Sequence, residues 1–225
     1  ENVEIDYQKI LDTCKELDMK IATIVTGRLY TEGKLSLIDD DKTIIQAAME
    51  GMRKYVDMAH KLKADIIIGW VRSIIPDMSK ADLYKERLAT NIKELALYAE
   101  DKNVKIFIEA INRYETNYLN SGKETKDFID MYDIPNTYVH LDTFHMNIED
   151  ENIAETIRYC GDKTGYIHFA DSNRRYPGAG HLDFSSVIKA LDEINFNGYV
   201  SVECLPWPTG EEAARMALKA IKEMF

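Results

Sequence analysis

"IFIEAINRYETNYLNS", residues 106–121, opens as a short apolar run and turns abruptly into carboxylates, amides and an arginine. The apolar part has the length and the β-branched content of a buried strand, which we predict to end at Glu109. An ionised carboxylate is costly to bury unless it is paired or bound to a metal. The stretch therefore indicates a core strand that presents a functional side chain at its carboxyl end.

The same kind of run recurs along the whole chain. Apolar runs of strand length occupy six segments, at residues 21–27, 65–70, 104–110, 137–143, 165–171 and 198–204. Amphipathic helical stretches separate them, most clearly at 81–100, with an apolar stripe formed by Leu83, Leu88, Ile92, Leu95 and Ala99. This alternation predicts right-handed βαβ units and a parallel sheet. Because no Gly-rich phosphate loop follows a strand, a barrel is favoured over a doubly wound nucleotide-binding sheet.

Composition limits the partners. The 225 residues are 45% hydrophobic, which is enough for a single domain spanning 1–225. With 28 Lys and Arg against 39 Asp and Glu the net charge is −11, so we expect neither nucleic acid nor an anionic membrane as a partner. The sequence contains no signal peptide and no apolar run near the roughly 20 residues of a membrane span. Three widely spaced cysteines suggest no disulfide framework, which predicts a cytoplasmic protein.

The last four predicted strands end in potential metal ligands. These residues are Glu109, Asp142, His168 and Glu203. Parallel barrels gather the carboxyl ends of their strands at one face, so one cation would account for all four side chains. Three carboxylates and one imidazole suit Mn²⁺, our first choice, or Mg²⁺ or Co²⁺, better than a structural zinc. The alternative for any one of these residues is a surface salt bridge at a strand end.

Four segments resemble the signature segments of the ketose 3-epimerases, the D-tagatose and D-psicose 3-epimerase group of the xylose isomerase-like barrel superfamily. They are "EAINRYETNYLNS" (109–121), "HLDTFHMNIED" (140–150), "GYIHFADSNRRYPGAGHLDF" (165–184) and "VSVECLP" (200–206). The resemblance implies a (β/α)₈ TIM barrel with one divalent metal held by the four side chains. Since six strands are visible, we expect the first two β/α units to be absent from this chain. The barrel would then open between the strands at 21–27 and 198–204, and residues 1–20 would form the helix before the first visible strand.

The chemistry permitted by these residues is proton exchange beside a ketone. Inverting a carbinol carbon needs a base on one face, an acid on the other, and a Lewis acid for the enediolate between them. Glu109 and Glu203 lie on strands separated by two others, so they can act from opposite faces of one carbon. The resemblance implies the same pair, with epimerisation at C3 of a free ketose through a cis-enediolate and a metal that bridges O2 and O3.

Three further residues are predicted to bind the substrate. Glu115 resembles a substrate-contacting glutamate of the family, and His145 and Arg174 are placed to reach a substrate oxygen or the developing negative charge. The neighbouring Arg175 could exchange roles with Arg174. His140 shares a strand face with Asp142 and is interpreted as a histidine of the packed interior that supports the site.

Other functions remain open at this stage. An aldose–ketose or hydroxypyruvate-type isomerase of the same superfamily would use similar residues, and a non-catalytic or truncated sugar-binding barrel is the alternative from another class. An endonuclease IV-type enzyme would need more than the five histidines present, together with a basic groove. The expected partner is a small ketose, and the expected assembly is a homodimer or homotetramer.

Overall fold

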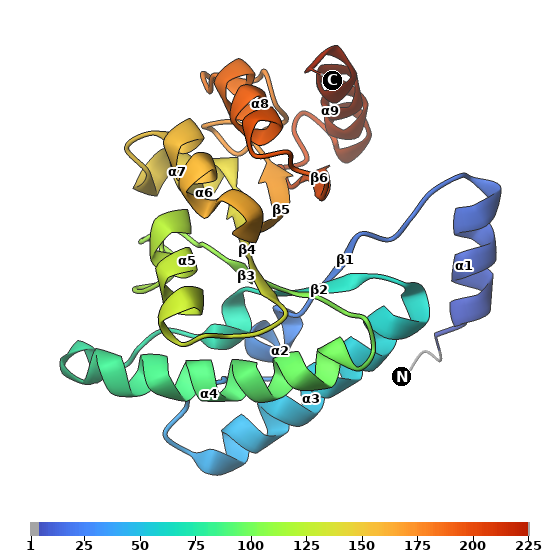
Figure 1. Cartoon of the computed structure of the whole chain (residues 1–225). Coiled ribbons are helices and arrows are strands. Elements are labelled where there is room, and N and C mark those ends of the chain that lie inside the picture. The colour runs from blue at the N-terminus through green and yellow to red at the C-terminus, as the bar shows by residue number, and fades with distance from the viewer. Residues whose placement is uncertain (1–4, 225) are drawn as a thin grey trace. The chain divides into compact units, whose positions relative to one another are not determined.

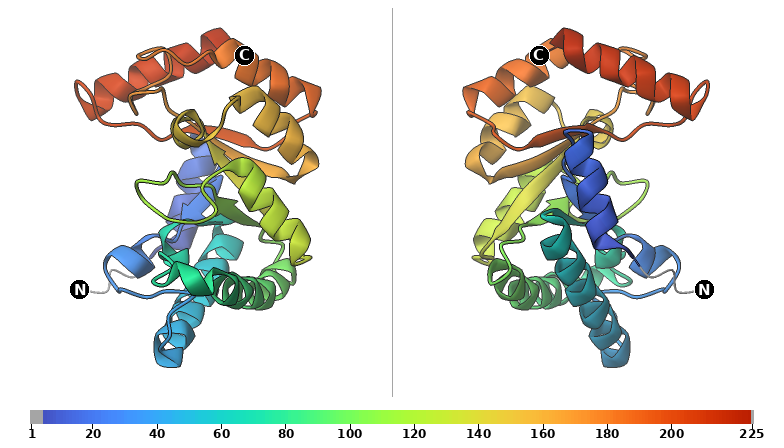
Figure 2. Two further views of the ribbon diagram at one scale, coloured as in Figure 1. Left: turned by 90° about the vertical axis from the view of Figure 1, so that its left-hand side faces the viewer. Right: turned by 90° about the vertical axis from the view of Figure 1, so that its right-hand side faces the viewer.

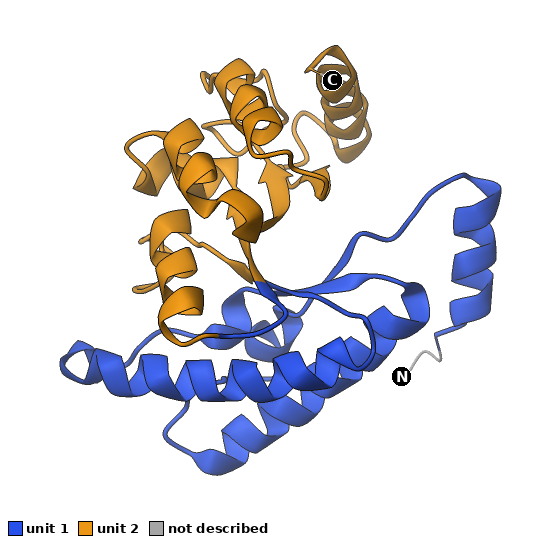
Figure 3. Ribbon diagram, viewed as in Figure 1, with its two compact units in different colours: residues 1–107, 134–137 blue, residues 108–133, 138–225 orange. Residues whose placement is uncertain are grey.

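The computed structural model describes residues 5–224 and divides into two compact units (Figure 3). Unit 1 comprises Glu1–Phe107 and Ile134–Thr137, and unit 2 comprises Ile108–Asp133 and Tyr138–Phe225. The boundary cuts two strands, between Phe107 and Ile108 and between Thr137 and Tyr138, so neither unit is one continuous stretch of chain. A single domain over residues 1–225 stays a prediction.

Within residues 5–224, six strands alternate with helices (Figure 1), which confirms the α/β pattern predicted from the sequence. The strand order is the chain order, β1-β2-β3-β4-β5-β6, as expected for a β/α barrel and not for a doubly wound sheet. Pairings of β1 with β2, β4 with β5 and β5 with β6 are parallel. Each strand coincides with a predicted apolar run: β1 (Thr23–Val25), β2 (Asp65–Ile68), β3 (Ile106–Glu109), β4 (Thr137–Asp142), β5 (Thr164–Phe169) and β6 (Tyr199–Val202).

The first and last strands of this order differ from the others in burial. Strands β2, β3, β4 and β5 are almost entirely buried, as expected for parallel strands covered on both faces. In β1 and β6 no residue is fully buried, and Val25 and Tyr199 are exposed. These strands stand at the two ends of the strand order of the described residues, and the opening expected between them stays a prediction.

Unit 1 is built around two long helices that pack side by side (Figure 1). Its helices are α1 (Tyr7–Glu16), α2 (Arg28–Thr31), α3 (Lys42–Leu62) and α4 (Ala81–Glu100), with 3₁₀ turns at Trp70–Arg72 and Met78–Lys80. Helix α3 also packs on α1 and on β2. The helix predicted within residues 1–20 is therefore present as α1, although residues 1–4 lie outside the described part. No helix within residues 5–224 combines the length and apolarity needed to cross a bilayer.

The apolar stripe predicted for residues 81–100 is mostly correct. Leu83 is the exception, because 49% of it is exposed. Tyr84 takes the buried place instead, and its hydroxyl donates a hydrogen bond to Asp40 Oδ2 at 2.9 Å. The predicted stripe residues that are buried are Leu88, Ile92, Leu95 and Ala99.

Unit 2 contains the helices that follow the last four strands. Helix α5 packs on α7, α7 packs on α8, and α8 packs on α9 (Figure 2). Between strand and helix the core is aromatic, with the rings of Phe169 and Phe184 5.1 Å apart. The helices are α5 (Gly122–Met131), α6 (Thr143–Glu149), α7 (Ile153–Cys160), α8 (Phe184–Glu193) and α9 (Gly210–Met224), and a 3₁₀ turn spans Gly161–Lys163.

Side-chain caps set the points at which the helices of unit 2 begin. Ser121, Asn152 and Asp183 accept backbone N–H groups at the starts of α5, α7 and α8. At α6 the cap is Asp142, which is also the last residue of β4. Strand and helix therefore meet without a loop, and the carboxylate between them is held in one orientation.

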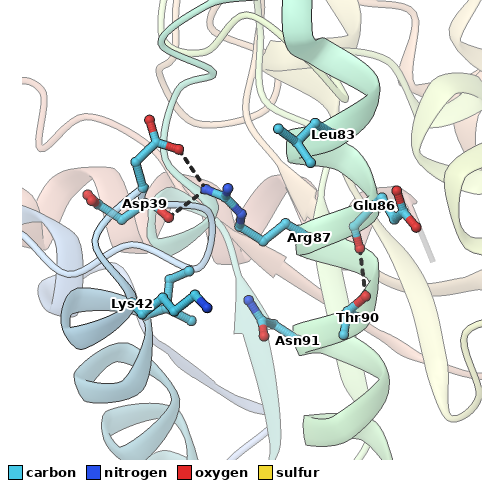
Figure 4. A pocket seen from close by; sticks show the side chains of 9 residues that line it. Asp39, Lys42, Leu83, Glu86, Arg87, Thr90 and Asn91 are labelled. Carbon is cyan, nitrogen blue, oxygen red and sulfur yellow. Dashed lines mark hydrogen bonds and ion pairs between the residues drawn. The ribbon is translucent and has the colours of Figure 1, made fainter.

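A pocket of about 430 Å³ lies within unit 1, between the 39–45 segment and α4 (Figure 4). Arg87 Nη1 ties the two sides together by donating hydrogen bonds to the carbonyls of Ile38 and Asp39 and to Asp40 Oδ1. Asn91 adds a hydrogen bond to the Leu37 carbonyl at 2.7 Å. None of the predicted site residues lines this pocket.

Candidate metal and substrate site

The four predicted ligands all lie in unit 2 and occupy the ends of β3, β4, β5 and β6. Glu109 and Asp142 are the last residues of their strands, and Glu203 follows β6 directly. In the β4–β5 register, Asp142 is paired with His168. The exposed fraction of the side chain rises around the site, from 0% for Asp142 through 9% for His168 and 12% for Glu109 to 44% for Glu203. The four side chains therefore extend from the core to the surface.

These four side chains converge. Each offers one ligand atom, and all four atoms lie within 4.8 Å of one another. His168 Nδ1 is 3.8 Å from Asp142 Oδ2 and 3.7 Å from Glu203 Oε2. Ligands bound roughly 2.1 to 2.3 Å from one divalent ion stand about 3 to 4.5 Å apart, so one ion fits among these atoms. The predicted convergence is present, while the role of each residue as a ligand stays a prediction.

Two buried atoms of this group have no hydrogen-bond partner in the described part of the chain. They are Asp142 Oδ2 and His168 Nδ1, which face each other across the site. Burial and the nearby Glu203 raise the pKa of Asp142 to about 7, and burial lowers the pKa of His168. Unpaired lone pairs on a buried carboxyl and a neutral imidazole are what a cation would satisfy. The donor set therefore fits a divalent metal.

His140 lies deeper in β4 and is completely buried, as predicted. Its ring contacts the ring of His168 edge to face, with centroids 4.3 Å apart. Burial, together with the neighbouring His168 and His145, keeps the pKa of His140 well below its usual value. His140 is therefore a neutral imidazole beside a predicted ligand.

On the Glu109 side, His145 is fixed by an amide that sequence reasoning did not assign. His145 Nε2 lies 3.8 Å from Glu109 Oε1. Its Nδ1 lies 2.7 Å from Asn112 Nδ2 and accepts the Asn112 backbone N–H at 3.4 Å. Asn112 Oδ1 accepts from the Tyr114 N–H, which orients the amide so that Nδ2 faces the histidine. Because both groups facing Nδ1 are donors, His145 carries its hydrogen on Nε2 and directs it toward Glu109.

On the Glu203 side, one arginine joins two carboxylates. Arg174 Nη2 donates to Glu203 Oε2 at 2.9 Å, and Nη1 donates to Glu115 Oε1 at 3.3 Å. Asn112 Nδ2 lies 3.2 Å from the same Glu115 oxygen, which links this side to His145. Arg175 instead lies over the Trp207 ring, with its Cζ 3.7 Å from the ring centroid, and the choice between the two arginines as substrate ligand stays a prediction. His145 and Arg174 therefore each contact one of the four converging side chains, and Glu115 is linked to them through Arg174.

The loop that carries Arg174 is organised by Asp171, a second residue missed in the sequence. Arg174 has a positive φ of 57°, which an arginine rarely adopts. The Asp171 carboxylate is buried, yet backbone N–H groups of Leu182, Ser172, Gly180 and Gly178 outweigh the burial and lower its pKa. A Cβ at Gly180 would collide with Asp171 Oδ1, so the backbone approaches this closely only with glycine.

Comparison with known proteins agrees with this site. A sequence profile described as "Xylose isomerase-like TIM barrel" matches residues 3–224. The chain belongs to this family. The L-ribulose 3-epimerase of Methylomonas sp. (strain DH-1) is 32% identical over 99% of this chain and 83% of its own length. The D-psicose 3-epimerase of Enterocloster bolteae is 33% identical over 75% of this chain and 57% of its own length.

Comparison with solved structures gives the same result. The crystal structure of a D-allulose 3-epimerase from Methylomonas sp. in complex with D-allulose matches with a TM-score of 0.84 and 28% identity. The match covers 98% of this chain and 82% of that protein. The ketose 3-epimerase resemblance and the barrel fold predicted from the sequence are thus confirmed. The names of these relatives support an isomerase-class enzyme.

The buried Asp142 carboxyl predicts how the stability of the metal-free chain depends on pH. Its pKa is raised to about 7 in the folded state, so between about pH 4 and 7 the folded chain keeps a proton that the unfolded chain loses. Asp142 therefore reduces stability progressively as pH rises through that window, by about 1.4 kcal/mol per pH unit at most. In thermal unfolding with chelator, the free energy of unfolding of Asp142→Asn, relative to that of the natural chain, should increase as pH rises from 5 to 7. For the control Glu151→Gln, at an exposed residue, the difference in stability from the natural chain should not change with pH. A difference for Asp142→Asn that also stays constant over this pH range would contradict the prediction.

Asn112→Asp tests the assigned tautomer of His145. A carboxylate accepts hydrogen bonds, so it would draw the imidazole hydrogen to Nδ1 and remove it from the nitrogen that faces Glu109. We expect turnover to fall by about 10- to 100-fold, with ring ¹⁵N chemical shifts of His145 changing from the Nε2–H to the Nδ1–H or protonated form. The matched change in the exposed Asn197 should leave both measurements unaltered. Unchanged ¹⁵N shifts in Asn112→Asp would refute the assignment.

Proposed function

We propose that this protein epimerises a free ketose at C3, with Glu109 and Glu203 as the acid/base pair. The observation that carries the proposal is the approach of these two carboxylates, with Asp142 and His168, to within 4.8 Å of one another. Polar partners flank both glutamates, His145 beside Glu109 and Arg174 beside Glu203. Ketose 3-epimerases among the relatives add support, including one related structure described in complex with D-allulose.

A divalent cation would be held by Glu109, Asp142, His168 and Glu203. The oxygen-rich donor set and the unpartnered Asp142 Oδ2 favour Mn²⁺ as the first choice, with Mg²⁺ or Co²⁺ as alternatives. When bound, such an ion supplies Lewis acidity that stabilises negative charge on the sugar oxygens. The remaining steps belong to side chains of this protein.

The proton transfers are assigned to the two glutamates. One carboxylate takes the C3 proton, the electron pair of the broken C–H bond passes into the enediolate, and the other glutamate returns a proton to the opposite face. For the reverse reaction the two residues exchange roles. The two carboxyl groups differ in environment, since Glu109 is nearly buried beside His145 while Glu203 is partly exposed and accepts from Arg174.

His145 and Arg174 are assigned to the oxygens of the substrate. The Nε2–H of His145 is on the opposite side of the ring from the Asn112 contact and can donate to a carbonyl or enediolate oxygen. Arg174 holds Glu203 with one nitrogen and Glu115 with the other, which orients both carboxylates toward a sugar. Glu115 then offers an acceptor for a sugar hydroxyl.

The charge of the site favours a free sugar over a sugar phosphate. Four carboxylates surround it, namely Glu109, Glu115, Asp142 and Glu203, and the guanidinium among them already contacts two. A substrate phosphate would add negative charge to this group without a basic cluster to receive it. Hydroxyl groups can donate to the same carboxylates.

Isotope exchange tests the reaction. The protein is incubated in D₂O with Mn²⁺ and a panel of free ketohexoses and ketopentoses, and products are followed by NMR. Deuterium should enter C3 of both epimers, because each passes through the same enediolate. Deuterium at C1 would indicate an aldose–ketose or hydroxypyruvate-type isomerase instead. Bound metal without exchange at any carbon of any sugar would favour a non-catalytic sugar-binding barrel.

Glutamine substitution tests the acid/base pair. Glu109→Gln and Glu203→Gln each keep an oxygen ligand and remove the proton acceptor, so metal content should be largely retained. Turnover should fall by several orders of magnitude, given the roughly 10² to 10⁴ that acid–base catalysis contributes. Glu211→Gln, an exposed glutamate at the start of α9, is the matched control. Turnover within about tenfold of the natural enzyme for either variant would exclude that residue from the pair.

A further inference from the structure

His140 is a buried polar side chain with no explanation in the proposed reaction. It is 0% exposed, and neither of its ring nitrogens has a hydrogen-bond partner among residues 5–224. The aromatic neighbours do not satisfy it, because Tyr166 packs against the ring at 5.1 Å and directs its hydroxyl to Ser201. A buried polar group without a partner lowers stability, and an apolar residue of similar volume would fill the same space without that loss. The presence of an imidazole at this position therefore suggests that one of its nitrogens binds a ligand.

The geometry around His140 defines a second group of potential ligands. Ligand atoms of Glu109, His140 and His168 lie within 4.8 Å of one another. This group shares Glu109 and His168 with the four-residue group, while His140 replaces Asp142 and Glu203. The two groups are therefore neighbouring positions for one ion, not two independent sites.

The chemistry of the two positions differs. The four-residue position offers three carboxylates and one imidazole, which suits hard ions such as Mn²⁺ and Mg²⁺. The position at His140 offers two imidazoles and one carboxylate, a combination that Zn²⁺ accepts with a fourth, open coordination site. Nitrogen donors also favour Zn²⁺ over Mn²⁺ in the general order of affinities.

We propose that His140 makes this site a two-position metal centre, in which Zn²⁺ binds Glu109, His140 and His168 while Mn²⁺ binds Glu109, Asp142, His168 and Glu203. His140 is then a determinant of metal selectivity. A zinc ion in its position leaves Glu203 and Asp142 outside its coordination shell. This inference rests on the metal site of the proposed function and is independent of the sugar and of the carbon that reacts.

X-ray absorption spectroscopy of the natural chain is the direct test. Imidazole ligands give a characteristic multiple-scattering pattern, so their number can be counted for each metal. We expect two imidazoles around Zn²⁺ and one around Mn²⁺. One imidazole around Zn²⁺ would overturn the proposal, and this measurement needs no variant.

His140→Met provides the second test, since methionine fills the cavity without a nitrogen donor. In chelator-competition titrations the dissociation constant for Zn²⁺ should rise by about 10- to 100-fold, as for loss of a residue that supports a metal site. The constant for Mn²⁺ should change by less than roughly threefold, because His140 is absent from the manganese position. His60→Gln, an exposed histidine of α3, is the matched control and should change neither constant.

The outcomes separate this inference from the proposed function. Equal weakening of both metals in His140→Met would show that His140 acts through the shared ligands, and unchanged Zn²⁺ binding would show that it is a packing residue; either result overturns the two-position centre. If the natural chain binds neither metal, the metal site of the proposed function fails as well. Mn²⁺ bound by one imidazole, with Zn²⁺ bound in the same way, leaves the proposed function standing and removes only this inference.

Discussion

The burial of Asp142 is the constraint on which the rest of the site depends. One carboxylate oxygen accepts the N–H of Phe144, and less closely that of His145, so it caps α6 at the point where β4 ends. The other oxygen is left facing His168 and Glu203 in a place that water does not reach. A strand that turned into a helix through a loop could not hold a carboxylate so rigidly. The cap thus fixes one oxygen of a buried carboxyl group as part of helix formation and leaves the other oxygen available to a cation.

A series of side-chain contacts around the site connects Glu109 to Glu203. Glu109 faces His145, Asn112 joins His145 to Glu115, and Arg174 joins Glu115 to Glu203. Each member orients the next, so the two glutamates proposed for proton transfer are fixed from opposite ends of one network. Removing any link would change the geometry at a distance, which is the behaviour of connected polar networks. The site is therefore a single electrostatic unit built on four strands and their loops.

Much of this could be predicted from the sequence, for identifiable reasons. The six strands and α4 follow from hydrophobic periodicity, and the four converging residues follow from their repeated position at strand ends. Asn112 and Asp171 were missed because asparagine and aspartate in a loop carry no signal that separates a site residue from a turn former. The orientation of Arg174 against Arg175 depends on a positive φ, which single-sequence patterns do not encode. The predicted burial of Leu83 was wrong for a similar reason, because helical spacing does not show how far the elements that pack against the helix extend along it.

The unequal exposure of the two glutamates has a consequence for how the enzyme resets between turnovers. In the proposed reaction each cycle leaves the pair with its protons exchanged, one carboxyl newly protonated and the other newly ionised. Glu203, 44% exposed, can exchange its proton with water directly, whereas Glu109 is only 12% exposed and faces a His145 nitrogen that already carries a hydrogen, so its exchange with water is slower. For both directions of the epimerisation, recovery of the starting protonation state then depends on proton exchange at Glu109. The free enzyme would exist as two isomers that differ only in the location of a proton, and their interconversion would set a limit on the rate that is independent of the sugar.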